Sequence, residues 1–226
     1  MGRRTGAAAL AAIMVYTAMW IGYLQDWALP AAVDSWLLDA FYPIGAEHPA
    51  WVTAWNVFCT VLGPLGLRIV GVVAIIWLLV RRQLRPALFL VISVELSALV
   101  TEVAKYLADR PRPETALVTA YGTSFPSGHA LGVMVAVLAF LTILLPVVGV
   151  RWRTPLIVAG VAVVVLIGLG RVVLNVHHPS DVLAGWALGF VWYLVCLWLV
   201  RPLPAITDAD VVTGADGKPP VPGTGS

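Results

Sequence analysis

Charged residues are scarce in this sequence. Asp, Glu, Lys and Arg make up 12% of the 226 residues, whereas a soluble domain has roughly 25%. Hydrophobic residues reach 60% and the mean hydropathy is +0.91. Such a chain has too little polar surface to cover a soluble globular fold, and it is too apolar to be intrinsically disordered. We therefore expect an integral membrane protein.

Cysteine and net charge are also low. Cys59 and Cys196 both lie in apolar runs, where they are expected to be small buried hydrophobes. Two such residues exclude a disulfide scaffold. The 14 Lys and Arg nearly balance the 12 Asp and Glu, giving a net charge of +2. We therefore expect no nucleic-acid partner.

The apolar segments predict an all-α bundle of six transmembrane helices, which fills residues 1–201. A membrane-spanning helix needs roughly 20 mostly apolar residues. No convincing small-residue cleavage site follows the first segment, so we expect it to be retained as a span. The expected spans are residues 7–24, 51–80, 86–106, 126–148, 155–174 and 179–200.

Three segments differ from a simple span. Residues 25–49 mix acidic and aromatic side chains, a composition that favours a short amphipathic helix at the membrane interface. Residues 51–80 would form a helix of about 45 Å, so we expect a kink or break at Gly63-Pro64. Residues 202–226 are rich in Pro and Gly and are predicted to be a disordered cytoplasmic tail.

The basic residues predict an orientation. If the N-terminus is cytoplasmic, nine of the fourteen Lys and Arg lie on that side, which favours cytoplasmic positions for both termini. The frequent use of Ala, Val and Arg is typical of a bacterium with a GC-rich genome, so we expect a bacterial inner membrane. Lys105, Arg112 and Arg171 fall instead at the outer ends of spans. The nine cytoplasmic residues are Arg3, Arg4, Arg81, Arg82, Arg85, Arg151, Arg153, Arg201 and Lys218.

Three polar segments are expected to meet at the outer face. They are residues 105–113, 125–129 and 170–181, and they hold every histidine except His48. Cations beside histidines, without cysteine and with few carboxylates, suit an anionic tetrahedral ligand better than a metal ion. We therefore expect neither a metal nor another cofactor.

Two helix starts add to this expected anion site. Pro126 and Pro179 each suit the first turn of a helix. Free N–H groups at a helix start bind phosphate, and a glycine lets the backbone approach it closely. Asp181 follows His177 by four residues, so its carboxylate can orient the imidazole as a nucleophile.

The order and spacing of these residues resemble the signature of the type 2 phosphatidic acid phosphatase superfamily. The pattern reads Lys-x6-Arg-Pro, Pro-Ser-Gly-His and Arg-x5-His-x3-Asp. With the six spans, the resemblance covers roughly residues 7–200. One departure is Gly170, where the family usually has serine before the arginine. The matching residues are Lys105, Arg112 and Pro113, then Pro126, Ser127, Gly128 and His129, then Arg171, His177 and Asp181.

The resemblance implies a role for each matched residue. His177 would attack phosphorus and form a phosphohistidine, and Asp181 would support it. His129 would protonate the leaving oxygen, after which water would hydrolyse the intermediate. The phosphoryl oxygens would be held by Lys105, Arg112, Ser127, Gly128 and Arg171.

The resemblance further implies metal-independent dephosphorylation of a membrane lipid phosphate or pyrophosphate at the extracytoplasmic face. Polyprenyl pyrophosphate, phosphatidylglycerol phosphate and phosphatidate are the candidate substrates, and the sequence does not select among them. A phosphotransferase that passes the phospho group to an alcohol is an alternative. So is a non-catalytic lipid-binding or transport protein, although His129, His177 and Asp181 argue against it. A haloperoxidase is disfavoured because those relatives are soluble, and no oligomeric state is predicted.

Several polar residues beside the motifs are ambiguous. Glu102 lies three residues before Lys105 and is a candidate to orient it. His178 does not match the motif spacing and is expected to be structural. For Arg110 the sequence leaves open a contact to a lipid head group or exposure to water, and Glu95 has no predicted partner.

Overall fold

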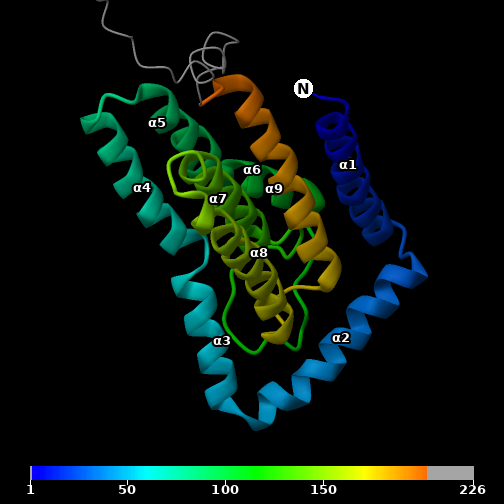
Figure 1. The fold of residues 1–226 in the computed structure, drawn as a ribbon. Helices are drawn as coiled ribbons and strands as arrows, with labels where there is room; N and C mark the ends of the chain where they lie inside the picture. The colour runs from blue at the N-terminus through cyan, green and yellow to red at the C-terminus, as the bar shows by residue number, and fades with distance from the viewer. Residues whose placement is uncertain (1, 203–226) are drawn as a thin grey trace, which may run out of the picture.

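The computed structural model describes residues 2–202, and all the regular secondary structure in that range is helical (Figure 1). The all-α expectation is confirmed. The predicted tail, apart from Pro202, lies outside the described residues. The helices are α1 (Arg3–Leu24), α2 (Ala28–Glu47), α3 (Pro49–Val61), α4 (Pro64–Val80), α5 (Leu84–Leu90), the π-helical turn η1 (Val91–Glu95), α6 (Ser97–Ala108), α7 (Gly128–Leu144), α8 (Val150–Val173) and α9 (Pro179–Val200).

Five helical segments within residues 2–202 are long and apolar enough to cross a membrane. They are α1, α3 with α4, α5 through α6, α8 and α9. The remaining expected span, residues 126–148, corresponds to α7, which has 17 residues and a length of about 25 Å at 1.5 Å per residue. The structure thus supports a helical membrane protein, while the count of six spans stays a prediction.

Helix α2 runs across one end of the bundle, between the ends of α1 and α3 (Figure 1). Trp36 on its outer side is 69% exposed, whereas Asp34 and Leu38 are buried. The predicted amphipathic segment is therefore a helix of 20 residues. Its inner face packs on the ends of α8 and α9.

The predicted break in the second span is confirmed. Helix α3 ends at Val61, and α4 begins at Pro64, whose missing N–H costs nothing in a first turn. Gly63 between them lies against the imidazole of His129, since a Cβ there would be 3.1 Å from Cδ2 of that ring. The break therefore contacts the second sequence motif.

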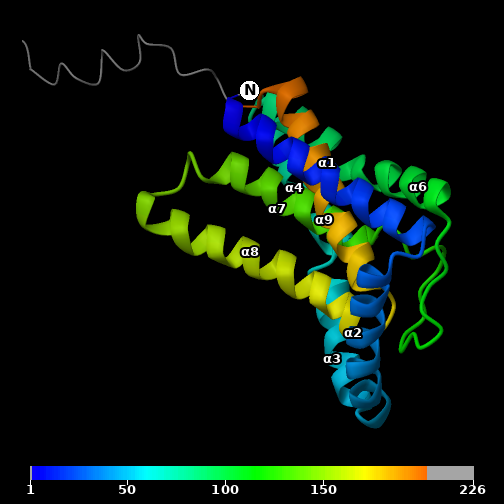
Figure 2. The same cartoon turned by 90° about the vertical axis from the view of Figure 1, so that its right-hand side faces the viewer.

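Helices α7 and α9 lie side by side with their main chains in contact (Figures 1 and 2). A Cβ at Gly185 would lie 2.6 Å from the carbonyl oxygen of Ser127, and one at Gly189 would lie 2.8 Å from that of Leu131. The N–H of Ser127 also donates to the carbonyl of Asp181 at 2.9 Å. The starts of these two helices, which carry the second and third motifs, are thereby joined.

A long loop connects α6 to α7 and extends past the ends of both helices (Figure 2). The N–H of Ser124 donates to the carbonyl of Arg110 at 2.7 Å, and that of Leu117 donates to the carbonyl of Leu174 at 3.0 Å. Asn175, buried and with a positive φ of 51°, donates its side-chain amide to the carbonyl of Leu38. These bonds fasten the loop and the α8–α9 turn to α2.

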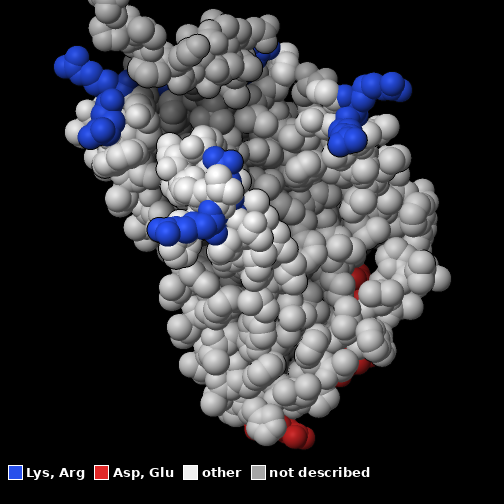
Figure 3. Space-filling view, in the orientation of Figure 1, with Lys and Arg blue, Asp and Glu red and all other residues white. Residues whose placement is uncertain are grey.

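Charged side chains separate between the two ends of the molecule (Figure 3). Lys and Arg gather where α1 and α8 begin and where α4 ends, while Asp and Glu are visible toward α2. The last described residues of α9 lie at the same end as the N-terminus (Figure 1). The concentration of Lys and Arg at one end is the feature on which the positive-inside rule depends.

Candidate active site

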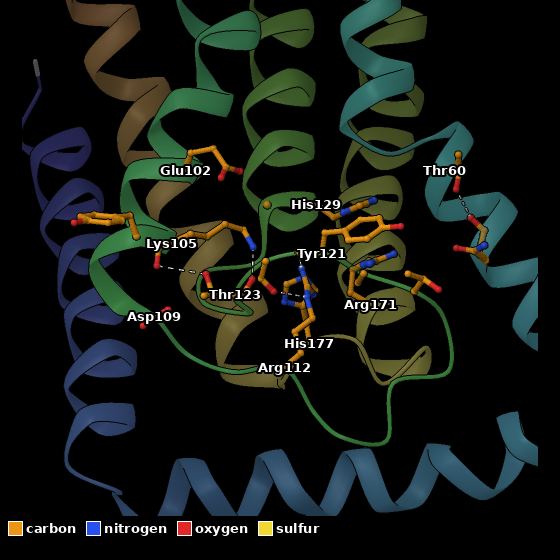
Figure 4. A pocket seen from close by; sticks show the side chains of 16 residues that line it. Thr60, Glu102, Lys105, Asp109, Arg112, Tyr121, Thr123, His129, Arg171 and His177 are labelled. Carbon is orange, nitrogen blue, oxygen red and sulfur yellow. Dashed lines mark hydrogen bonds between the residues drawn. The ribbon is translucent and has the colours of Figure 1, made fainter.

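A cavity of about 650 Å³ lies where α6, α7 and α8 end or begin near the long loop (Figure 4). Lys105, Arg112, Arg171, His129 and His177 point toward one another in it. The structure therefore brings all three motifs to one place. The lining residues are Asn56, Thr60, Glu102, Lys105, Tyr106, Asp109, Arg112, Thr119, Ala120, Tyr121, Gly122, Thr123, Gly128, His129, Arg171 and His177.

The cations reach the cavity from different elements. Lys105 lies in the last turn of α6, and its ammonium donates to the carbonyl of Thr123. Arg171 lies in the last turn of α8 and is only 6% exposed. Its Nε has no hydrogen-bond partner within residues 2–202. A buried guanidinium with a free donor beside a cavity is suited to binding an anion.

Arg112 is held by the loop around it. Its guanidinium donates to the carbonyls of Tyr121 and Gly122 at 2.9 and 3.0 Å, and to the carbonyl of Val176 at 2.8 Å. Burial lowers the pKa of Arg112, and the negative charge of nearby Asp181 partly offsets this lowering. Arginine nevertheless keeps its positive charge under all ordinary conditions. The same Nη1 lies 3.2 Å from Nε2 of His177.

This last contact defines the protonation of His177. A guanidinium can only donate, so Nε2 of His177 must accept and carries a lone pair. The ring proton is then on Nδ1, which lies 3.5 Å from Oδ2 of Asp181. Burial lowers the pKa of His177 to about 4, against the opposing effect of Asp181. The imidazole is therefore neutral near neutral pH, with its nucleophilic nitrogen beside a cation.

Asp181 lies behind His177 in the first turn of α9 and is completely buried. Its Oδ2 accepts the N–H of His178 at 2.9 Å and lies 3.2 Å from Nδ1 of that residue. This hydrogen bond, from the main-chain N–H of the N-cap residue to a side chain three positions later, belongs to the capping box of α9. His178, expected to be structural, contacts the carboxylate that faces His177.

The second motif forms the start of α7. His129 and Gly128 line the cavity, and a Cβ at Gly128 would lie 3.0 Å from Cγ2 of Thr101. Ser127 is buried, and its hydroxyl accepts the N–H of Ala130 at 3.4 Å as the cap of this helix. A phosphate contact through Ser127 stays a prediction, because the residue is not part of the cavity lining.

Glu102 lines the cavity near Lys105. It is exposed, and within the described residues no ion pair joins its carboxylate to Lys105. Its predicted orienting role therefore rests on proximity alone. In the same part of the chain, no three His, Cys, Asp or Glu side chains gather as metal ligands.

A second carboxylate at this site, that of Asp34, was not predicted from the sequence. Arg110 neither faces water nor is free to bind a head group, because it forms ion pairs with Asp181 at 2.7 Å and with Asp34 at 2.9 Å. Asp34 comes from α2, 76 positions earlier in the chain. No spacing pattern in the sequence relates positions so far apart.

The departure at Gly170 has a packing reason. A Cβ at this position would lie 2.6 Å from Sγ of Cys59 and 2.8 Å from Cε3 of Trp55. Both are side chains of α3, and Cys59 is fully buried. The space of the usual serine is therefore filled by α3.

Comparison with known proteins places this site in a family. Residues 86–204 match the family model of the PAP2 superfamily. The chain is 38% identical over 101 residues to "Phosphatidylglycerophosphatase B" of Bacillus subtilis, covering 43% of this chain and 49% of that protein. It is 33% identical over 119 residues to an "Undecaprenyl-diphosphatase" of Sulfolobus acidocaldarius, covering 50% of this chain and 54% of that one. The chain thus spans about half the length of these curated relatives.

The fold has also been seen in a solved structure. A transmembrane PAP2 type phosphatidylglycerolphosphate phosphatase from Bacillus subtilis superposes with a TM-score of 0.73, covering 91% of this chain and 100% of that one at 21% identity. At that identity the likeness concerns the fold. The family match includes the three motifs that line the cavity. The chain belongs to the PAP2 superfamily.

Proposed function

We propose that this protein is a metal-independent phosphatase of membrane lipid phosphates or pyrophosphates that works through a phosphohistidine at His177. The observation that carries the proposal is the position of His177 at the cavity, with its Nε2 3.2 Å from Nη1 of Arg112. A nucleophile needs a free lone pair, and phosphoryl transfer needs positive charge around the phosphoryl oxygens. Lys105, Arg112 and Arg171 supply that charge.

The first step transfers the phosphoryl group to the enzyme. Nε2 of His177 forms a bond to the terminal phosphorus, and the bond from that phosphorus to its leaving oxygen breaks. The leaving oxygen belongs to the lipid alcohol in a phosphate and to the lipid phosphate in a pyrophosphate. His129 gives its proton to that leaving oxygen. Asp181, beside Nδ1 of His177, stabilises the positive charge that develops on the imidazole.

The second step releases phosphate. His129, now neutral, takes a proton from a water molecule that attacks the phosphohistidine. The N–P bond breaks, inorganic phosphate leaves, and both histidines return to their starting states. The cations that held the phosphoryl oxygens in the first step act again in the second.

The setting of the cavity and the names of the relatives support the proposed substrate class. It lies at the end of the bundle opposite the basic one (Figures 3 and 4), so the positive-inside rule supports an extracytoplasmic site with cytoplasmic termini in a bacterial inner membrane. The relatives are named for phosphatidylglycerophosphate and undecaprenyl diphosphate. Both are anionic lipids, and phosphatidate shares their chemistry. The surrounding bilayer supplies the substrate.

The test is phosphate release by the purified full chain in detergent with EDTA. Undecaprenyl pyrophosphate, phosphatidylglycerol phosphate and phosphatidate form the panel. The His177→Ala variant should lose release by about 10⁴-fold or more, the scale seen when a nucleophile is removed. His48→Ala, an exposed histidine on the α2–α3 turn, is the matched control and should behave as wild type.

Other outcomes distinguish the alternatives. Activity lost in EDTA and restored by Mg²⁺ would contradict the metal-free mechanism. Release that falls when an acceptor alcohol is added, with a new phosphorylated product, would identify a phosphotransferase. No release from any lipid by folded protein would favour a binding or transport protein.

A further inference from the structure

We propose that Asp34 and Arg110 are positioning residues for the reaction, which hold one oxygen of Asp181 toward His177. The inference rests on the proposed function, because it assigns what orients the group behind the nucleophile. It places part of the active site on α2. That helix lies outside residues 86–204, which the family model matches.

The guanidinium of Arg110 donates hydrogen bonds to two carboxylates. Nη1 donates to Oδ1 of Asp181 at 2.7 Å, and Nη2 donates to Oδ2 of Asp34 at 2.9 Å. All three side chains are at most 11% exposed. Charge-assisted hydrogen bonds in such a buried place are strong and geometrically selective.

The ion pair between Arg110 and Asp181 occupies one carboxylate oxygen and leaves the other to face His177. Oδ1 of Asp181 is occupied by Arg110, so Oδ2 is the oxygen that faces Nδ1 of His177, at a distance of 3.5 Å and without a hydrogen bond between them. The same Oδ2 accepts the N–H of His178. Arg110 on one oxygen and His178 on the other therefore prevent rotation of the carboxylate.

Asp34 also fixes the start of α9. Its Oδ1 accepts the N–H of Ser180 at 2.9 Å, and its Oδ2 accepts the hydroxyl of Ser180 at 2.6 Å. Ser180 is the residue before Asp181, and its hydroxyl accepts from Nη1 of Arg110 at 2.7 Å. Asp34 thus holds both the guanidinium and the backbone next to the carboxylate.

The reason for two carboxylates is geometric. An arginine facing one carboxylate tends to bind both of its oxygens in a fork. Asp34 occupies Nη2 and so keeps Arg110 on Oδ1 of Asp181 alone. Without Asp34, the guanidinium is free to turn onto both oxygens of Asp181 and to draw Oδ2 away from His177.

The test uses the full chain in detergent and measures kcat and KM separately. Asp34→Asn cannot accept all the hydrogen bonds that Asp34 accepts. In one orientation its NH₂ faces Nη2 of Arg110, and in the other it faces the N–H of Ser180, and both of these groups are donors. We expect Asp34→Asn and Arg110→Gln each to lower kcat roughly ten- to hundredfold, with KM unchanged within about twofold. Asp34→Glu should recover part of the loss. Matched controls are Asp39→Asn, an exposed carboxylate of α2, and Arg153→Gln, an exposed arginine of α8.

Two further measurements separate positioning from loss of structure. Vanadate should bind each variant as it binds wild type, because Lys105, Arg112 and Arg171 are untouched. The double variant Asp34→Asn/Arg110→Gln should lose no more kcat than either single variant, since both act through Asp181. If Asp34→Asn does not bind vanadate, Arg110→Lys is tested instead. Its lysine keeps the positive charge but cannot bridge the carboxylates of Asp34 and Asp181.

Unchanged kcat in a variant that binds vanadate would overturn the inference, as would additive losses in the double variant. Wild-type activity in His177→Ala would instead overturn the proposed function and this inference together. The two failures are therefore distinguishable.

Discussion

Nη1 of Arg112 lies 3.2 Å from Nε2 of His177, and the same Nη1 donates to the carbonyl of Val176. One donor group thus holds both the main chain before the histidine and its ring nitrogen. A phosphoryl oxygen that enters this position can replace the imidazole as the partner of Arg112. In the proposed mechanism, Nε2 is then released beside the phosphorus that it attacks.

Replacing Arg112 by Lys should impair both binding and turnover. An ammonium keeps the charge but cannot make the four contacts that the planar guanidinium makes to the loop and to His177. We expect kcat/KM to fall roughly a hundredfold. Steady-state kinetics check this, with Arg153→Lys as control. Unchanged kcat/KM would mean that charge alone is required.

The stability of the protein should fall as the solution is acidified. Burial lowers the pKa of His177 to about 4, whereas an unfolded histidine titrates near about 6.5. Between these values the unfolded chain binds the extra proton, so stability is lost as the pH drops through that window and levels off below it. The contribution of His177 is about 3 kcal/mol.

Thermal unfolding in detergent between about pH 7 and pH 4 measures this effect. His177→Asn should flatten the decline of the melting temperature, whereas His48→Asn, at an exposed position, should leave it unchanged. Equal slopes in wild type and His177→Asn would show that this imidazole does not titrate on unfolding.

Restoring the usual serine at position 170 should destabilise this protein. The new Cβ would meet Sγ of Cys59 at 2.6 Å and the indole of Trp55 at 2.8 Å, and overpacking of this kind costs about 1–3 kcal/mol. Cys59→Ala in the same chain should recover part of the loss. Thermal unfolding tests both. Gly149→Ser is the control, because nothing lies within 4 Å of a Cβ there.

A cysteine at Glu114 should react with an impermeant thiol reagent on intact cells. Glu114 is exposed on the loop between α6 and α7, and the native Cys59 and Cys196 are 0% exposed. Arg151→Cys, at the basic end, should react only after permeabilisation. The reverse pattern would place the cavity on the cytoplasmic side.

The sequence predicted the elements whose ends carry strong local signals. Pro179 begins α9, and the break at Gly63-Pro64 is where it was expected. Helix α7 is shorter than predicted. Ser127 caps it after Pro126, and it ends at Leu144, shortly before Pro146, which has no N–H to continue the helical hydrogen bonds.

The candidate site was predictable where its residues lie at motif spacing. Five motif residues meet because each lies at or beside a helix end on the same face of the bundle. They are Lys105, Arg112, His129, Arg171 and His177. The contact of Asp34 with Arg110 joins α2 to a loop 76 positions later. It depends on how α2 crosses the bundle, and hydropathy alone does not define that path.

The contact of α7 with α9 through Gly185 and Gly189 has a mechanical consequence. Because the main chains approach each other directly at these two glycines, no long side chain separates the helices at these positions to absorb a shift. A change in bilayer thickness or lateral pressure would therefore tilt α7 and α9 together as one unit. His129 and the turn that carries His177 would keep their separation while the lipids around them rearrange.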